Sequence, residues 1–189
     1  MKKIVIAPLA ALIAVSAPTS VLAEGEETWA DRISVKGDIR LRHEGIDEDG
    51  EENRNRGRYR ARLGIAAEVS PNVKVVMQVA SGADNPVSRN VTFDGGFDVN
   101  DIGFDLAYVD WAFADGWNFY GGKMKNPLFR AGGAPLIWDG DLNPEGFAVK
   151  YSKGPLFVNL AGFSVEERSS DSDSLLSAIQ VGGKFDLAD

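Results

Sequence analysis

Six arginines stand at alternate positions in two nearby segments of the chain. They are Arg40, Arg42, Arg56, Arg58, Arg60 and Arg62. Because successive side chains of an extended strand point to opposite faces, this spacing places the guanidinium groups of each segment on one face. Guanidinium groups attract anions through charge and through several N–H donors. The predicted chemistry of this cluster is electrostatic, with no bond made or broken.

Residues for covalent or metal-dependent chemistry are scarce. The chain has no cysteine and one histidine, His43. This removes thiol chemistry and Cys/His zinc sites, and it leaves little scope for a Ser-His-Asp triad. We expect no enzyme activity, no catalytic residue, no metal and no cofactor. With 28 acidic against 20 basic residues, the chain lacks the net basic surface that nucleic acids require, so no nucleic-acid partner is expected.

The first 23 residues have the pattern of a cleaved signal peptide. Lys2 and Lys3 precede an apolar run at residues 4–15, which is too short to cross a bilayer as a helix. Ala23 fits signal-peptidase cleavage before Glu24. We therefore expect a signal peptide at 1–23, followed by one exported domain at 24–189.

Alternation of apolar and polar residues dominates the rest of the chain. It is strict where Ile39 and Leu41 alternate with Arg40 and Arg42, which is typical of a strand with two unlike faces. No long helical pattern interrupts it. About eight strands are expected, at residues 33–43, 56–68, 73–80, 101–113, 117–125, 146–152, 156–165 and 175–185.

The connections between these strands alternate in length. Tight turns are expected at 70–72, 114–116 and 153–155, and long polar loops at 44–55, 81–100, 126–145 and 166–174. Short turns at one end and long loops at the other are typical of an antiparallel transmembrane β-barrel, whose strands need about 9 to 11 residues to cross a bilayer. A soluble sandwich is the alternative. The arginine-rich face disfavours it, because such a face suits a water-filled lumen.

Two features of the expected strands concern the direction of side chains. In residues 101–113 the polar phase set by Asp101 and Asp105 conflicts with Asp110. This indicates a β-bulge or a rim position near Tyr108 and leaves the facing of this strand open. Aromatic residues near strand ends are expected to form interfacial girdles. These are Trp111, Trp117, Tyr120 and Tyr151.

Several longer strings are similar to a known family. They are KGDIRLRHEGID, NRNRGRYRARLGI, DLAYVDWAF, GGKMKNPLFR and LIWDGDLNPEG. Together, over residues 33 to about 150, they resemble the putative porin family of proteobacterial outer membranes and, more distantly, the phosphate-selective porins. The resemblance implies an outer-membrane barrel through which small hydrophilic solutes or ions diffuse passively. It supplies no substrate.

The resemblance also bears on the size of the barrel. It implies about 16 strands, of which this chain supplies about eight as the N-terminal half of a longer porin. The alternative is a complete eight-stranded barrel, whose interior is just filled by side chains and conducts poorly. In function, the two alternatives are a diffusion pore and a structural or adhesive barrel without an open pore.

The loop at 126–145 is rich in apolar residues for a connection between strands. It holds Phe129, Leu136, Ile137 and Trp138, an apolar content that is a liability if it is exposed. General porins fold their third loop into the barrel, so we expect this loop to pack against the inner wall. Packing on the outer rim or at a subunit interface is the alternative. The predicted constriction-loop residues are Arg130, Trp138, Asp139, Asp141 and Glu145.

The predicted pore-lining residues are the six arginines with Lys123 and Lys125. Asp139, Asp141 and Glu145 are expected to face the arginines across the lumen, which gives a transverse field and a weak anion preference. In the alternative, the arginines pair with Asp38, Glu68 and Asp105, and little net field remains. The expected partners are outer-membrane lipid and lipopolysaccharide, with small hydrophilic solutes or ions as cargo. The porin resemblance is compatible with a homotrimer.

Overall fold

The structure is a computed structural model that describes residues 11–13, 28–82 and 85–185. Its elements, in chain order, are β1 (Ala11–Ile13), η1 (Trp29–Arg32), β2 (Ile33–Ile46), β3 (Arg54–Ser70), β4 (Val73–Ser81), β5 (Val91–Thr92), β6 (Ile102–Ala114), β7 (Trp117–Lys123), η2 (Ala131–Gly133), β8 (Glu145–Lys153), β9 (Leu156–Glu166) and β10 (Ser174–Gly183). No helix within these described ranges is long and apolar enough to cross a membrane.

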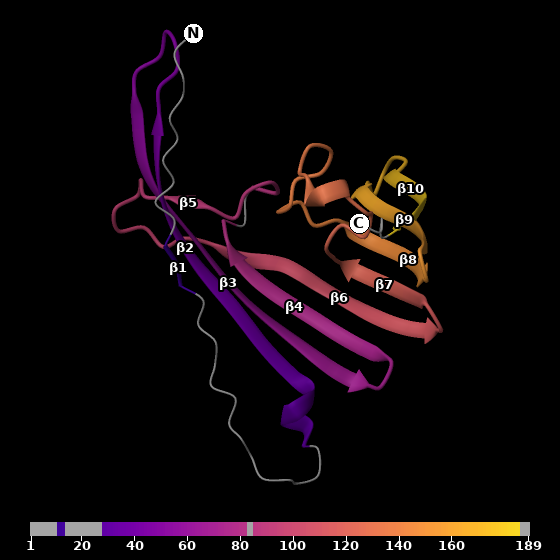
Figure 1. The fold of residues 1–189 in the computed structure, drawn as a ribbon. Helices are drawn as coiled ribbons and strands as arrows, with labels where there is room; N and C mark the ends of the chain where they lie inside the picture. Colours follow the sequence, from indigo (N-terminus) through magenta and orange to yellow (C-terminus); the bar gives the residue numbers. More distant parts are fainter. Residues whose placement is uncertain (1–10, 14–27, 83–84, 186–189) are drawn as a thin grey trace.

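All ten strands belong to one antiparallel sheet (Figure 1). Each strand pairs with the next along the chain, except that β5 pairs with β3 alone while β4 pairs directly with β6. The described strands run from β1 to β10 without closing into a barrel. The eight predicted strands are all present, as β2 to β4 and β6 to β10, so the all-β antiparallel fold is confirmed.

Two short strands were not predicted. β5 lies within the second long loop, and β1 lies within the segment predicted to be a signal peptide. The rest of that segment is outside the described residues.

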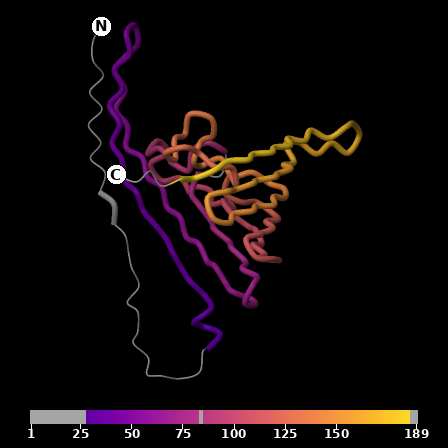
Figure 2. The backbone as a smooth tube through the Cα atoms, turned by 45° about the vertical axis from the view of Figure 1, so that its right-hand side comes forward, coloured from indigo at the N-terminus to yellow at the C-terminus, as the bar shows by residue number. Residues whose placement is uncertain are grey.

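The connections have the predicted alternation in length. The tight turns after β3, β6 and β8 lie at one end of the strands, and the long connections lie at the opposite end (Figure 1). The β2–β3 hairpin extends well beyond the neighbouring strands, and the β9–β10 hairpin projects in another direction (Figure 2).

The apolar side chains of the sheet are exposed and its polar side chains are covered, which is the reverse of the pattern in a soluble protein. One face, here called the apolar face, carries large hydrophobic side chains that are exposed, such as Leu63 at 53% and Ile179 at 74%. The other, the polar face, carries the arginines, Gln78, Asp105 and Asn159, which are partly or fully covered. Contiguous exposed apolar surface of this kind is typical of a site that contacts another protein or a membrane.

A β-bulge in β6 resolves the conflicting phase of residues 101–113. Gln78 of β4 pairs with Leu106, whereas the next residue, Val79, pairs with Phe104. Asp105 is therefore the extra residue. Cross-strand partners share a face, so Leu106 lies with Gln78 on the polar face, which Asp105 also joins through its contacts. The predicted bulge exists, at Asp105 and not near Tyr108.

Three of the four predicted girdle residues lie together on the apolar face. Trp117 packs against Tyr151 with tilted rings whose centroids are 4.7 Å apart, and Trp111 and Trp117 both contact Phe113 near the tight turns. Tyr120 does not join them. It pairs with Asp110 and contacts Tyr108 on the polar face, so its predicted place in the girdle is wrong.

Two glycines allow the strands to approach closely where the third long loop begins and ends. Gly122 and Gly146 are cross-strand partners, and both have positive φ. A Cβ on Gly122 would lie 2.2 Å from the Ala107 carbonyl oxygen, and one on Gly146 would lie 2.1 Å from that of Gly162. Any larger residue would push neighbouring strands apart at this level.

Candidate functional site: an arginine wall and two inward loops

The β2–β3 register assembles the six predicted arginines on the polar face. Arg40 stands opposite Arg60, and Arg42 stands opposite Arg58. Arg56 and Arg62 continue the same phase of β3 at either end. The six form the arginine wall. Like charges directly opposite each other are destabilising, so the wall requires compensation.

Acidic side chains provide part of that compensation. Glu44 contacts Arg42, Arg56 and Arg58. Asp38 lies 2.8 Å from Arg60 and 2.7 Å from Arg62. Only Asp38, Glu44 and Asp141 make ion pairs with the six arginines within the described residues, so the wall keeps an excess of positive charge.

Pairing of the wall with acids of the polar face is therefore partial. Asp38 is a partner, as that alternative predicts. Glu68 instead pairs with Lys74 at 3.2 Å, and Asp105 pairs with Arg89 at 2.8 Å. Neither of these two acids contacts the wall.

Several wall N–H groups have no acceptor among the described residues. The Nε atoms of Arg40, Arg42, Arg58 and Arg60 are buried without a hydrogen-bond partner. Asn90 satisfies other atoms of the same arginines, because its side-chain oxygen accepts from Arg40 Nη2 at 2.5 Å and its carbonyl accepts from Arg58 Nη2 at 3.2 Å. The wall thus keeps donor capacity beyond what the protein uses.

The third long loop folds over the polar face. This loop, residues 126–145, is called the constriction loop below. Its Trp138 packs on Phe163 of β9 with ring centroids 6.0 Å apart, and its Phe129 packs on Phe157 at 5.2 Å. Both phenyl rings of β9 lie on the face that carries Asn159.

The four apolar residues predicted for this loop are covered unequally, and Phe129 is itself 40% exposed. Leu136 and Ile137 are 93% and 96% exposed at the tip, contrary to the expectation that the loop's apolar content as a whole packs on the wall. The packed residues Phe129 and Trp138 flank this exposed tip on both sides.

One predicted constriction-loop acid faces the arginine wall. Asp141 Oδ1 lies 3.9 Å from Arg60 Nη1. Asp139 is exposed and accepts a hydrogen bond from the Asp141 amide, and Glu145 pairs with Lys123 at 2.8 Å. Of the three acids that were predicted to face the arginines, only Asp141 therefore does so.

The other two predicted loop residues hold the loop's own shape. Arg130 Nη1 donates to the Trp138 carbonyl at 3.1 Å, and the Trp138 indole donates to the Leu142 carbonyl at 2.7 Å. These bonds close the loop on itself between its anchors. Neither side chain contacts the wall.

The two predicted pore-lining lysines differ in position. Lys123 ends β7 opposite Ala107 and Glu145, in the strand phase of the apolar face. Lys125 lies beyond the strand, and its Nζ donates to the Gly140 carbonyl at 3.5 Å. Partial burial lowers the pKa of Lys125 from its ordinary value, opposed by its attraction to Asp105. Lys125 thus belongs to the electrostatic environment of the polar face.

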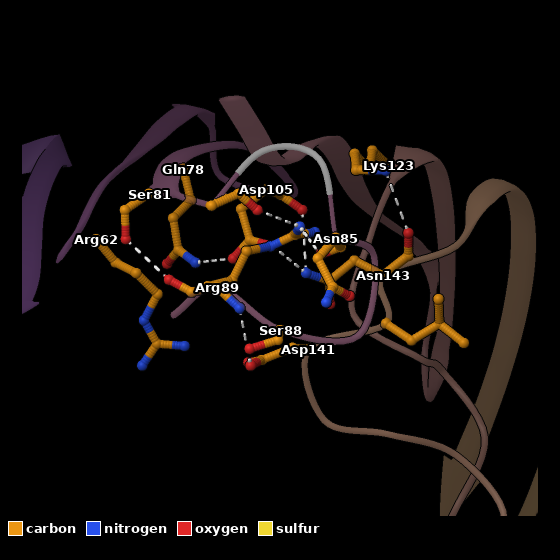
Figure 3. A network of polar contacts seen from close by, with 12 residues as sticks. Arg62, Gln78, Ser81, Asn85, Ser88, Arg89, Asp105, Lys123, Asp141 and Asn143 are labelled. Carbon is orange, nitrogen blue, oxygen red and sulfur yellow. Dashed lines mark hydrogen bonds and ion pairs between the residues drawn. The ribbon is translucent and has the colours of Figure 1, made fainter. Parts of the chain in front are cut away.

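The second long loop also enters the polar face, which the sequence did not indicate. Its Arg89 is 6% exposed and bonds Asp105 at the bulge, while the Arg89 amide donates to Asp141 at 3.4 Å (Figure 3). Asn143 joins the same group. The phase conflict in β6 was a signal for Asp105, but Arg89 and Asn143 lie in loops where no periodicity marks them.

Comparison with known proteins gives one positive result. A family model described as a putative porin matches residues 46–187, which is more than half of the chain. No curated protein matches the sequence.

Proposed function

Because this chain belongs to the putative porin family, we propose that it forms an outer-membrane pore for passive diffusion of small hydrophilic solutes and ions, with a weak preference for anions. In this proposal the protein catalyses no reaction. Lipid and lipopolysaccharide surround it, and ions or small solutes are its cargo.

The inverted burial of the sheet is the observation that carries the proposal. Leu63 and Ile65 are exposed on the apolar face, whereas Arg60 and Arg62, which come just before them in the sequence, lie on the covered polar face. In a membrane barrel the apolar face meets lipid, where a charge costs about 2 to 4 kcal/mol at the midplane. The same alternation places the arginines toward water in the lumen.

Unequal numbers of charges support the anion preference. Six arginines of the wall meet three carboxylates, those of Asp38, Glu44 and Asp141. Basic side chains lining a pore favour anions. The acidic balance of the whole chain, −8, opposes this at the pore mouth, so the preference is weak.

A structural or adhesive barrel is the competing function. The long β2–β3 hairpin favours it, because its tip, residues 47–53, is exposed and acidic beyond the rest of the sheet (Figure 1). Such a barrel needs no open lumen. The two functions therefore differ in conductance.

Single-channel recording in planar bilayers tests the proposal with the protein isolated from outer membranes. A porin gives discrete ohmic steps, and a salt gradient gives a reversal potential of the sign for anions. Correctly folded, heat-modifiable protein that inserts without conductance steps supports the structural barrel and rejects the pore.

A further inference from the structure

The most buried acid of the described chain lies at the bulge of β6. Asp105 is 2% exposed and accepts hydrogen bonds from Gln78 at 2.6 Å, from Arg89 Nε at 2.8 Å and from Asn143 Nδ2 at 2.6 Å (Figure 3). A buried carboxylate is tolerated only when it is paired and hydrogen-bonded. Two of its three partners come from loops and not from the sheet.

Arg89 connects the second long loop to this carboxylate. Its Nη1 donates to the Asn85 carbonyl at 2.9 Å, and its own carbonyl accepts from the Ser81 hydroxyl, also at 2.9 Å. Ser81 in turn accepts from the Ala61 amide of β3. Through this one side chain and one carbonyl the loop is bound to β6 and β4, and Ser81 links the second of these contacts to β3.

Asn143 connects the end of the constriction loop to the same carboxylate. Its side-chain amide donates to both the Asp105 carboxylate and the Asp105 carbonyl, and it is 5% exposed. The Met124 amide donates to the Pro144 carbonyl at 2.9 Å, which closes the base of the loop. Bonds to a charged acceptor at this depth are stronger than bonds at the surface.

A second anchor holds the start of the constriction loop. The Gln180 side chain of β10 accepts from the Phe129 amide at 2.7 Å and donates to the Phe129 carbonyl at 2.9 Å. The loop is thus attached at β6 and at β10. Asp141 lies near the β6 attachment, two residues before Asn143.

We propose that Arg89, Asp105 and Asn143 form a latch. This latch holds the second long loop and the constriction loop as one unit and keeps Asp141 against the arginine wall. The latch is a positioning device for the pore and touches no solute. In this respect the inference rests on the proposed function. Its mechanical part, the fixing of the loops, does not. Because only Leu142 separates Asp141 from Asn143, release of Asn143 frees Asp141 from Arg60.

Asn143→Leu tests the latch, because leucine keeps a similar volume and removes both donated bonds. Asn118→Leu is the matched control: Asn118 also lies on the polar face and donates to one acid, Asp110, at 2.7 Å, but it contacts neither loop. A nitroxide label on Ile137→Cys at the exposed loop tip reports motion, and the absence of other cysteines makes labelling specific. Asn143→Ala is a second variant if leucine disturbs folding.

The latch predicts that Asn143→Leu raises the mobile fraction of the label by about tenfold, equivalent to ~1.4 kcal/mol, while Asn118→Leu leaves it unchanged. It also predicts more frequent current fluctuations in the Asn143 variant. Equal mobility in wild type and in folded Asn143 variants overturns the latch. Equal loosening by Asn118→Leu does the same. Absence of current in the wild type rejects the pore and leaves the label result to decide the latch.

Discussion

Asp141 of the constriction loop lies 3.9 Å from Arg60 of β3, and this contact joins the loop to the arginine wall. Among the residues that the structure describes, it is the one ion pair between this loop and the six arginines. The field across the polar face therefore depends on a single loop carboxylate, with Asp38 and Glu44 interleaved among the arginines themselves.

Asp141→Asn is expected to strengthen anion preference. It removes one of three carboxylates that offset the wall and leaves the backbone unchanged. The measurement is the reversal potential in a salt gradient, which should move toward the anion value. Asp139→Asn, two residues away and directed at the loop's own backbone, is the control. If both variants give the same shift, the contact with Arg60 has no special role.

Replacing Arg58, Arg60 and Arg62 with Gln is expected to move the reversal potential toward cations. The triple change removes half of the wall's positive charge while keeping polar side chains of similar length. The shift should be larger at about 0.1 M than at about 1 M salt, because the screening length falls from ~10 to ~3 Å. Lys153→Gln, at a tight turn in a pair with Asp115, is the control. An unchanged potential in a correctly assembled triple variant removes the wall from the permeation path.

Deletion of residues 131–141 is expected to increase single-channel conductance. The deleted segment carries Trp138 and Asp141, while the anchors at Phe129 and Asn143 remain. A Gly-Ser pair joins the ends. Conductance equal to wild type in a protein that still assembles shows that the loop does not narrow the pore, whatever its packing on the sheet.

An arginine introduced on the apolar face is expected to lower the free energy of unfolding most when it lies at the middle of a strand. Leu160 and Leu156 share that face of β9, and Leu156 starts the strand beside a tight turn. Leu160→Arg should lower the free energy of unfolding from lipid vesicles by about 2 to 4 kcal/mol, and Leu156→Arg by about 0 to 1. If both substitutions lower the free energy of unfolding equally and only slightly, this face is exposed to water and not to lipid.

The strands and their faces could be predicted because their signal is local. Period-two alternation in β2 and β3 predicts that Arg40, Arg42, Arg58 and Arg60 lie on one face, and the register confirms it. The bulge was predictable in existence but not in position. The outward residues are even-numbered before the bulge, as in Ile102 and Phe104, and odd-numbered after it, as in Val109 and Trp111. Leu106 hides this change in the sequence, because it is an apolar residue that is buried on the polar face.

The contacts of the loops could not be predicted in the same way. Arg89 and Asn143 reach Asp105 only because a bulge turns that carboxylate toward two loops at once. Nothing in the local sequence of either loop encodes this meeting. Tyr120 illustrates a related limit: an aromatic residue near a strand end suits a girdle, but its strand phase, set by its pairing with Asp110, places it on the other face.

The division of the sheet into a lipid face and a water face is the central claim, and cysteine scanning along β3 tests it most directly. The chain has no cysteine of its own, so a single nitroxide can be placed in turn at each position from Tyr59 to Ala66 in protein reconstituted into lipid vesicles. The account predicts a period of two. Labels at 59, 61, 63 and 65 collide mainly with oxygen dissolved in lipid, and labels at 60, 62, 64 and 66 collide mainly with a water-soluble nickel complex. Water access at Leu63 and Ile65, or the same access at all eight positions, would contradict it.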